Sequence, residues 1–369
     1  MMATSFGKDS SFLIRSATPF NGGPPPAKVR RAFVTPVENF FVRAHAVDVP
    51  KVDAASYAFD VGGLVRSPLK LSLAELRLKF PTQRLMATMQ CAGNRRDQLI
   101  AIEPIPGEVP WAIEAISNGQ WEGVRLADVL DAAGVDSSRG AAHVEFIGLD
   151  QVERHGHTFA YGGSIPLEKA RRPEVLLAWS MNGKPLEPIH GFPLRLVIPG
   201  YICARSVKWL KQINVIARPS ENYFQSHAYK LFPSDVRAAT VDWNAGAMIG
   251  PTQVTSAITS PEQGASVAAG FLKVAGWAIA GEHDVERVEI STDGGKTWLA
   301  AQFVDQQDKP DRWTWRFWDA RVTLSPGEHQ IVARATDSAG NTQPADARAL
   351  WNFKGYMNNA WHRVDVEVK

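Results

Sequence analysis

The sequence predicts two domains of different class, an α+β domain followed by an all-β sandwich of the immunoglobulin type. The chain has 369 residues, more than two domains of roughly 150 residues would need. Between Phe40 and about Ala217, short apolar runs alternate with helical patterns. Beyond Pro261 helical periodicity nearly disappears, and short strand-like runs are separated by turns such as 293–295. A domain boundary is therefore expected near residues 250–260.

The first 35 residues differ from both domains. They show little periodicity and contain three consecutive prolines at 24–26. This composition predicts an extended N-terminal arm rather than a packed element. We therefore divide the chain into an arm at 1–35, a first domain at 36–250 and a second domain at 255–369.

Two helices and several strands are expected in the first domain. Ser72 is placed to cap a helix that ends at Lys79, before Pro81. A second helix is expected to end at Gly134, because four apolar side chains before it share one face: Leu126, Val129, Leu130 and Ala133. Four runs have the character of strands: 143–147, 175–179, 192–198 and 207–216.

The second domain is predicted from strands alone. Six short runs qualify: 271–279, 285–290, 297–303, 313–318, 329–334 and 348–351. A stretch of about 110 residues with six or seven strands is typical of an immunoglobulin-like sandwich.

Composition excludes several classes of protein. Lys and Arg number 40 against 38 Asp and Glu, so the formal charge is only +2 and a general nucleic-acid binder is not expected. The two cysteines, Cys91 and Cys203, exclude a disulfide scaffold and a four-cysteine zinc site. The most apolar stretch, 267–281, is interrupted by Lys273 and is too short to cross a bilayer, so no membrane insertion is expected.

Cys91 is the first candidate for chemistry. It ends an apolar run and is followed by a turn that carries Arg95 and Arg96. Positive charge favours the thiolate, which is a nucleophile or a soft ligand for a transition metal. The alternative is a small buried apolar side chain. Because no second cysteine lies at short spacing, zinc is disfavoured.

Two further clusters are cationic. Arg43 and His45 would share one face of a strand and suit an anion, although an exposed edge strand is an alternative. The segments 190–195 and 204–209 carry Arg and Lys side chains able to hold a phosphate, or to serve as ordinary surface charge. The chain has no Walker or dinucleotide loop, no serine nucleophile elbow and no HExxH helix. These features together favour an anionic substrate or cofactor.

The order of the motifs resembles that of the sulfite oxidase family of molybdenum enzymes. The resemblance covers residues from about 36 to 368, and it is greatest to bacterial sulfite dehydrogenases without a fused haem domain. It rests on six segments: FFVR at 40–43, CAGNRR at 91–96, HGFPLR at 190–195, VKWL at 207–210, DGGKTW at 293–298 and NAWHR at 359–363.

The resemblance implies a role for individual residues. Cys91 would be the one protein ligand of molybdenum in a molybdopterin cofactor, and Tyr229 would lie beside the metal. Arg43, Arg96 and Arg363 would line the anion pocket. The remaining positions would hold the pterin and phosphate of the cofactor or pack beside it: Phe41, His45, Asp150, His190, Arg195, Ser206 and Lys208.

The resemblance also implies an activity and partners. Sulfite would be oxidised to sulfate. The chain contains no CxxCH motif or haem segment, so no haem is expected and the electrons would pass to a separate acceptor, a c-type cytochrome or oxygen. A homodimer through the second domain is implied.

Three alternatives stay open for the function. Two are enzymes of the same fold, a sulfane-sulfur dehydrogenase and a nitrate reductase. The third is a non-enzymatic immunoglobulin-like binding protein. For the compartment, we expect the periplasm with an export signal already removed, and the cytoplasm is the alternative.

Overall fold

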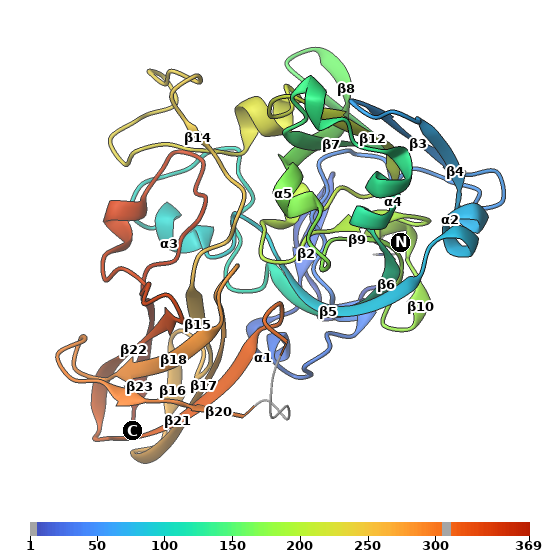
Figure 1. The fold of residues 1–369 in the computed structure, drawn as a ribbon. Coiled ribbons are helices and arrows are strands. Elements are labelled where there is room, and N and C mark those ends of the chain that lie inside the picture. Colours follow the sequence, from blue (N-terminus) through green and yellow to red (C-terminus); the bar gives the residue numbers. More distant parts are fainter. Residues whose placement is uncertain (1–5, 305–310) are drawn as a thin grey trace.

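The computed structural model describes residues 6–304 and 311–369. Figure 1 shows two bodies, a larger one containing the first two-thirds of the chain and a smaller one formed by the last third. The class predicted for each is confirmed, since the first combines sheets with short helices and the second is built from two sheets. No helix within these two ranges is long and apolar enough to span a membrane.

Two five-stranded sheets organise the first domain. One has the order β10-β9-β6-β5, with β11 also paired to β9. Its strands are β5 (Thr82–Gln90), β6 (Ile116–Arg125), β9 (Leu176–Met181), β10 (Lys184–Pro185) and β11 (Arg195–Val197). The other has the order β4-β3-β12-β7-β8, in which β12 runs parallel to β3 and antiparallel to β7. Its strands are β3 (Ala58–Gly63), β4 (Leu69–Ser72), β7 (His143–Arg154), β8 (His157–Pro166) and β12 (Leu210–Ile216).

The two helices predicted for this domain are confirmed. Helix α2 (Leu73–Lys79) begins with a capping box, because the Ser72 hydroxyl accepts from the backbone of Glu75 while the Glu75 carboxylate accepts from the backbone of Ser72. Helix α4 (Leu126–Ala133) ends at Gly134, whose φ of 68° is the left-handed conformation that glycine adopts without strain. Three shorter helices are α1 (Pro26–Val29), α3 (Arg96–Ile100) and α5 (Leu167–Ala170), and a small ribbon pairs β13 (Lys230–Leu231) with β14 (Ala247–Met248).

The second domain is a sandwich of a four-stranded and a five-stranded sheet. The first has the order β15-β17-β21-β20, with β15 (Thr255–Ser260), β17 (Gly270–Ile279), β20 (Gln302–Phe303) and β21 (Arg316–Leu324). The second has the order β16-β23-β22-β18-β19, with β16 (Ala265–Val267), β18 (Val285–Ser291), β19 (Leu299–Ala300), β22 (Gly327–Asp337) and β23 (His362–Val368). Buried side chains from both sheets form one core, Trp318 and Ile331 among them.

In the second domain one predicted strand is wrong and three strands were missed among the described residues. Residues 347–350 form a 3₁₀ turn, because the Asp346 carboxylate accepts a hydrogen bond from the Arg348 backbone and caps a helical turn. Strands β15, β16 and β23 lay outside the expected runs. The segment between β22 and β23 therefore does not stay in the sandwich. It returns to the first domain and packs beside α3, as the red segment in Figure 1 shows.

The N-terminal segment also differs from the expectation of an unpacked arm. It forms an antiparallel pair, β1 (Leu13–Ala17) and β2 (Phe20–Gly23), and the side chains of Phe12, Phe20 and Val29 are buried. The backbones of Gly22 and Val42 exchange two hydrogen bonds. A Cβ on Gly22 would lie 2.5 Å from a backbone oxygen, so the glycine allows this close approach. Residues 1–5 of the expected arm lie outside the described residues.

Candidate active site

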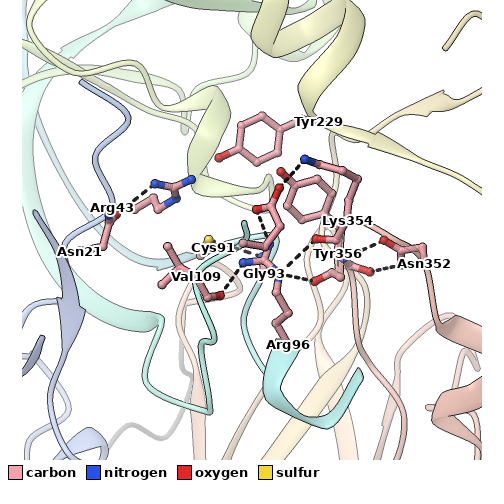
Figure 2. A network of polar contacts seen from close by, with 12 residues as sticks. Asn21, Arg43, Cys91, Gly93, Arg96, Val109, Tyr229, Asn352, Lys354 and Tyr356 are labelled. Atoms are coloured by element: carbon pink, nitrogen blue, oxygen red, sulfur yellow. Dashed lines mark hydrogen bonds and ion pairs between the residues drawn. The ribbon is translucent and has the colours of Figure 1, made fainter. Parts of the chain in front are cut away.

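Cys91 lies where β5 ends and the chain turns into α3. Its side chain is 3% exposed, and its sulfur accepts a hydrogen bond from the backbone of Gly93 at 3.4 Å. Arg95 has a φ of 64°, which closes the turn and aims Arg96, at the start of α3, back beneath the sulfur (Figure 2). The pKa of the Cys91 thiol is lowered to about 6 by a hydrogen bond with the thiol of Cys203, while burial opposes this and the charges of Arg43 and Arg96 add to it. The thiolate is therefore the favoured form of Cys91 near neutral pH.

Two cations from distant parts of the sequence lie beside this sulfur, Arg43 in the segment after β2 and Arg96 at the start of α3. A third cation, Lys354 in the loop before β23, lies farther along the same group of side chains (Figure 2). The Arg96 guanidinium donates to the backbone oxygens of Val109, Lys354 and Gly355 at 2.7, 3.1 and 3.1 Å. The Glu108 carboxylate lies 3.6 Å from Arg96 and also binds the ammonium of Lys354. The loop of the second domain is thus fixed to the first domain at the site.

Gly355 is required for this arrangement. Its φ is 60°, and a Cβ there would lie 2.6 Å from the Arg96 side chain. The Arg96 guanidinium lies over the Tyr356 ring at 5.1 Å, and Tyr356 in turn stacks on Tyr229 at 5.2 Å. The loop therefore contributes a cation and an aromatic wall to the site.

Arg43, His45 and Tyr229 form a chain of hydrogen bonds with a defined direction. Arg43 Nη2 lies 3.2 Å from His45 Nδ1, and His45 Nε2 lies 2.8 Å from the Tyr229 hydroxyl. A guanidinium can only donate, so Nδ1 must accept. Burial, reinforced by Arg43, holds the pKa of His45 well below its usual value, so the neutral ring carries its hydrogen on Nε2 and donates it to Tyr229. The hydroxyl hydrogen of Tyr229 is therefore left free to be donated elsewhere.

A cavity with an empty volume of about 600 Å³ opens beside this group. Nine of the predicted site residues line it: Phe41, Arg43, His45, Asp150, His190, Arg195, Ser206, Lys208 and Tyr229. They come from segments as far apart as 41 and 229 in the sequence, and the fold brings them to one place. Cys203, Tyr161 and Trp209 also line the cavity, and none of the three was among the predicted site residues.

The cations of this cavity lack carboxylate partners. Arg195 donates to the backbone oxygens of Leu196, His190 and Ser206, and Lys208 donates to that of Ile189. In the described part of the chain, no carboxylate lies within ion-pair distance of Arg43, Arg195 or Lys208. Burial lowers the pKa of Arg195 to about 10 and that of Lys208 to about 7. Because buried cations are normally paired, the cavity is suited to an anionic group such as a phosphate.

Asp150 gives the cavity an acceptor as well. Its Oδ1 atom is buried and has no hydrogen-bond partner among the described residues. Burial raises the pKa of its carboxyl to about 6, against the opposing charge of Lys208. The N–H groups of a pterin ring would satisfy this oxygen while the ammonium and guanidinium groups hold a phosphate. The residues present therefore fit a molybdopterin cofactor with its metal toward Cys91.

Arg363 does not belong to this site, contrary to the prediction. It lies within β23, opposite Val332, and its guanidinium is 5.5 Å from the Trp361 ring. Lys354 takes the place expected for it, nine residues earlier. The physical reason is that the chain has already left the first domain and entered the sandwich by His362. The predicted site did not include Lys354, Glu108 or Tyr356. Lys354 carried a usable signal, because it is a cation directly before Gly355 in the same C-terminal segment as Arg363.

Comparisons with known proteins agree with this geometry. A family model described as "Oxidoreductase molybdopterin binding domain" matches residues 46–224, and another described as "Mo-co oxidoreductase dimerisation domain" matches residues 247–369. A sulfite oxidase of Arabidopsis thaliana is 39% identical, with 96% of this chain and 93% of the relative covered. A sulfite oxidase of Gallus gallus is 42% identical, with 95% and 76% covered.

Two other similar proteins are described differently. A nitrate reductase [NAD(P)H] of Hordeum vulgare is 36% identical, with 95% of this chain but 41% of the relative covered. The solved structure of the sulfane dehydrogenase SoxCD from Paracoccus pantotrophus superposes with a TM-score of 0.79 at 24% identity, with 96% of this chain and 88% of the other covered. At that identity the likeness concerns the fold.

Proposed function

The chain belongs to the sulfite oxidase family of molybdopterin-dependent oxidoreductases, and on that premise we propose that it oxidises sulfite to sulfate and passes the electrons to a separate acceptor. The observation that carries the proposal is the placing of one thiolate, Cys91, beside Arg43 and Arg96, where Arg43 and the neighbouring Cys203 line the cationic cavity. Membership of the family also removes the reading as a non-enzymatic binding module.

The cofactor and the protein contribute different parts of the proposed reaction. When bound, the molybdopterin cofactor supplies the oxygen-atom transfer and the redox change. The Cys91 thiolate would be its protein ligand to the metal, and Arg195, Lys208 and Asp150 would hold its phosphate and pterin. The metal would thereby be held next to the cations at the end of the cavity.

The remaining side chains bind and orient the substrate. Sulfite is a small anion, and Arg43 and Lys354 offer it charge-assisted hydrogen bonds. Arg96 donates to backbone oxygens of Lys354 and Gly355 and lies 3.6 Å from the Glu108 carboxylate, so it positions the loop that carries Lys354. Tyr229 can donate its hydroxyl hydrogen to an oxygen in the site, since His45 donates to the other side of that hydroxyl. The buried walls of Tyr229 and Tyr356 exclude water from the substrate.

The acceptor, the assembly and the compartment are parts of the same proposal. We propose a c-type cytochrome as acceptor and a homodimer through residues 247–369, which the match to a dimerisation domain supports. The proposed compartment is the periplasm. Subcellular fractionation checks the last point, and recovery of the protein in the cytoplasm alone would contradict it.

Steady-state turnover tests the substrate. The full chain, loaded with molybdenum cofactor, is assayed with sulfite, thiosulfate and nitrate, using ferricyanide and then cytochrome c as acceptor for the oxidations and a reduced dye as donor for nitrate. We expect turnover of sulfite with both acceptors. If a fully loaded sample turned over only nitrate, or only a sulfane-sulfur compound, the sulfite assignment would be wrong.

The affinity for the cofactor should depend on pH. Lys208 has a pKa of about 7 in the cavity, and a neighbouring phosphate raises it because the anion favours the ammonium. Between the two pKa values binding takes up a proton, so affinity falls as pH rises above 7, by up to about tenfold per pH unit. Fluorescence titration of the cofactor-free chain with molybdopterin, between about pH 7 and 9, measures this slope. The matched control is Lys208→Arg, whose fixed charge should flatten the slope; an equally steep slope would contradict the assignment.

A further inference from the structure

The two cysteines of the chain, which are 112 positions apart in the sequence, lie side by side. Gln90 and Ile202 form an isolated parallel bridge between the end of β5 and the turn η4 (Cys203–Arg205). Each cysteine is the next residue after its member of this bridge. The bridge therefore brings the backbone of Cys91 next to that of Cys203 at the start of η4. The structure places the two residues together, since Cys203 packs against the apolar cluster that contains Cys91 and lowers the pKa of its thiol.

The bridge brings the backbones on either side of the pair close together. Neighbouring strands lie about 4.8 Å apart, and a disulfide requires Cα atoms about 4.4–6.8 Å apart, so residues that directly follow a bridge are candidates for a disulfide. Cys91 is buried, whereas Cys203 is partly exposed and lines the cavity. A small oxidant therefore reaches Cys203 from this cavity, and Cys91 from a second cavity that it lines with Gln90 and Ile202.

We propose that Cys91 and Cys203 form a site of reversible oxidation, at which hydrogen peroxide converts the pair into an intramolecular disulfide. In the first step the Cys91 sulfur attacks the peroxide; an S–O bond forms, the O–O bond breaks, and hydroxide leaves and is protonated to water. In the second step the Cys203 sulfur attacks that of Cys91; the S–S bond forms, the S–O bond breaks, and the departing hydroxide takes the thiol proton of Cys203. In total two thiols lose two electrons and one peroxide becomes two waters.

The consequence of this reaction rests on the proposed function. A disulfide withdraws the thiol that would ligate molybdenum, so the oxidised chain can hold the pterin and phosphate yet cannot bind the metal through Cys91. Reduction by a dithiol restores the ligand. In the loaded enzyme the metal occupies Cys91, and the disulfide cannot form. Oxidation therefore controls the loading of the enzyme rather than its turnover.

Thiol counting and mass spectrometry test the chemistry. The full chain, purified from a host unable to make molybdopterin, is treated with hydrogen peroxide and then unfolded. We expect the free thiols to fall from two to none, and a cross-linked pair of peptides lighter by two hydrogen atoms to join residues 91 and 203. Dithiothreitol should restore both thiols. Persistence of both thiols, oxygen addition without a cross-link, or a link between two chains would each overturn the proposal.

A variant and a loading assay complete the design. In Cys203→Ser, Cys91 can gain oxygen but cannot cross-link, so its peptide should become heavier and not lighter. Uptake of molybdenum cofactor by the oxidised wild-type chain should fall to background and recover after reduction. The peptide analysis of the wild type needs no variant, so it decides the matter even if Cys203→Ser does not fold. A loaded enzyme that oxidises sulfite but whose unloaded form never cross-links would overturn this inference alone, leaving the proposed function intact.

Discussion

Replacing Cys91 by serine should abolish sulfite turnover while leaving most of the pterin bound. Serine fills nearly the same space but offers a hard, weakly acidic hydroxyl where the metal requires a soft thiolate. The surroundings of Cys91 favour the thiolate, and a serine hydroxyl stays protonated in the same place. The pterin and phosphate are held elsewhere, by Asp150, Arg195 and Lys208, and those contacts remain. We expect turnover to fall to the level of cofactor-free protein.

Two measurements on one preparation check this outcome. Pterin released on denaturation measures how much cofactor is held, and molybdenum analysis measures how much metal remains with it. The expected result is near-normal pterin, depleted metal and no turnover. If Cys91→Ser retained metal and turned over sulfite within about tenfold of the wild type, Cys91 would not be the essential ligand.

The class of the first domain and both of its longer helices could be predicted because the signals are local, whereas strands β3 to β6 were not among the predicted runs. Cys91 and Arg96 bracket one turn, so local spacing places this pair. Capping residues marked both helices for the same reason, since a cap acts within one helical turn. The strand expected to carry Arg43 and His45 is wrong, because only Val42 forms an isolated bridge there and the two side chains meet through a hydrogen bond instead.

The parts that failed depend on contacts between distant segments. Nothing in the local pattern near Arg363 shows that the chain crosses back to the first domain at Lys354 and has left it again by His362. The proximity of Cys91 and Cys203 likewise depends on the bridge between Gln90 and Ile202. The residues around each cysteine give no sign of this bridge. Long-range pairing is a property of the whole fold, and one sequence without its structure does not reveal it.

Replacing Arg43 by glutamine should lower kcat/KM for sulfite by about a hundredfold, whereas the same change at Arg363 should leave it unchanged. Arg43 lines the cavity and donates to Asn21, Ala44 and His45. Its loss removes a charge-assisted hydrogen bond to the anion and the donor that fixes the tautomer of His45. These effects together are worth about 3 kcal/mol, which corresponds to on the order of a hundredfold.

The pattern of kinetic effects across the variants decides whether each side chain belongs to the anion pocket or to the surface. Lys354→Gln should mainly raise the KM for sulfite, because Lys354 supplies charge to the anion and its ion pair with Glu108 holds the loop. Arg43→Lys should recover only part of the loss, since an ammonium keeps the charge but cannot bind Asn21, His45 and an anion in one plane.

Steady-state kinetics with ferricyanide as acceptor measure all four variants. A rise in KM for Arg363→Gln equal to that for Arg43→Gln would return Arg363 to the anion pocket. If the KM of Arg363→Gln is unchanged, the anion pocket receives its C-terminal cation from Lys354, whose side chain reaches from the second domain to the first. Substrate binding would then depend on the contact between the two domains.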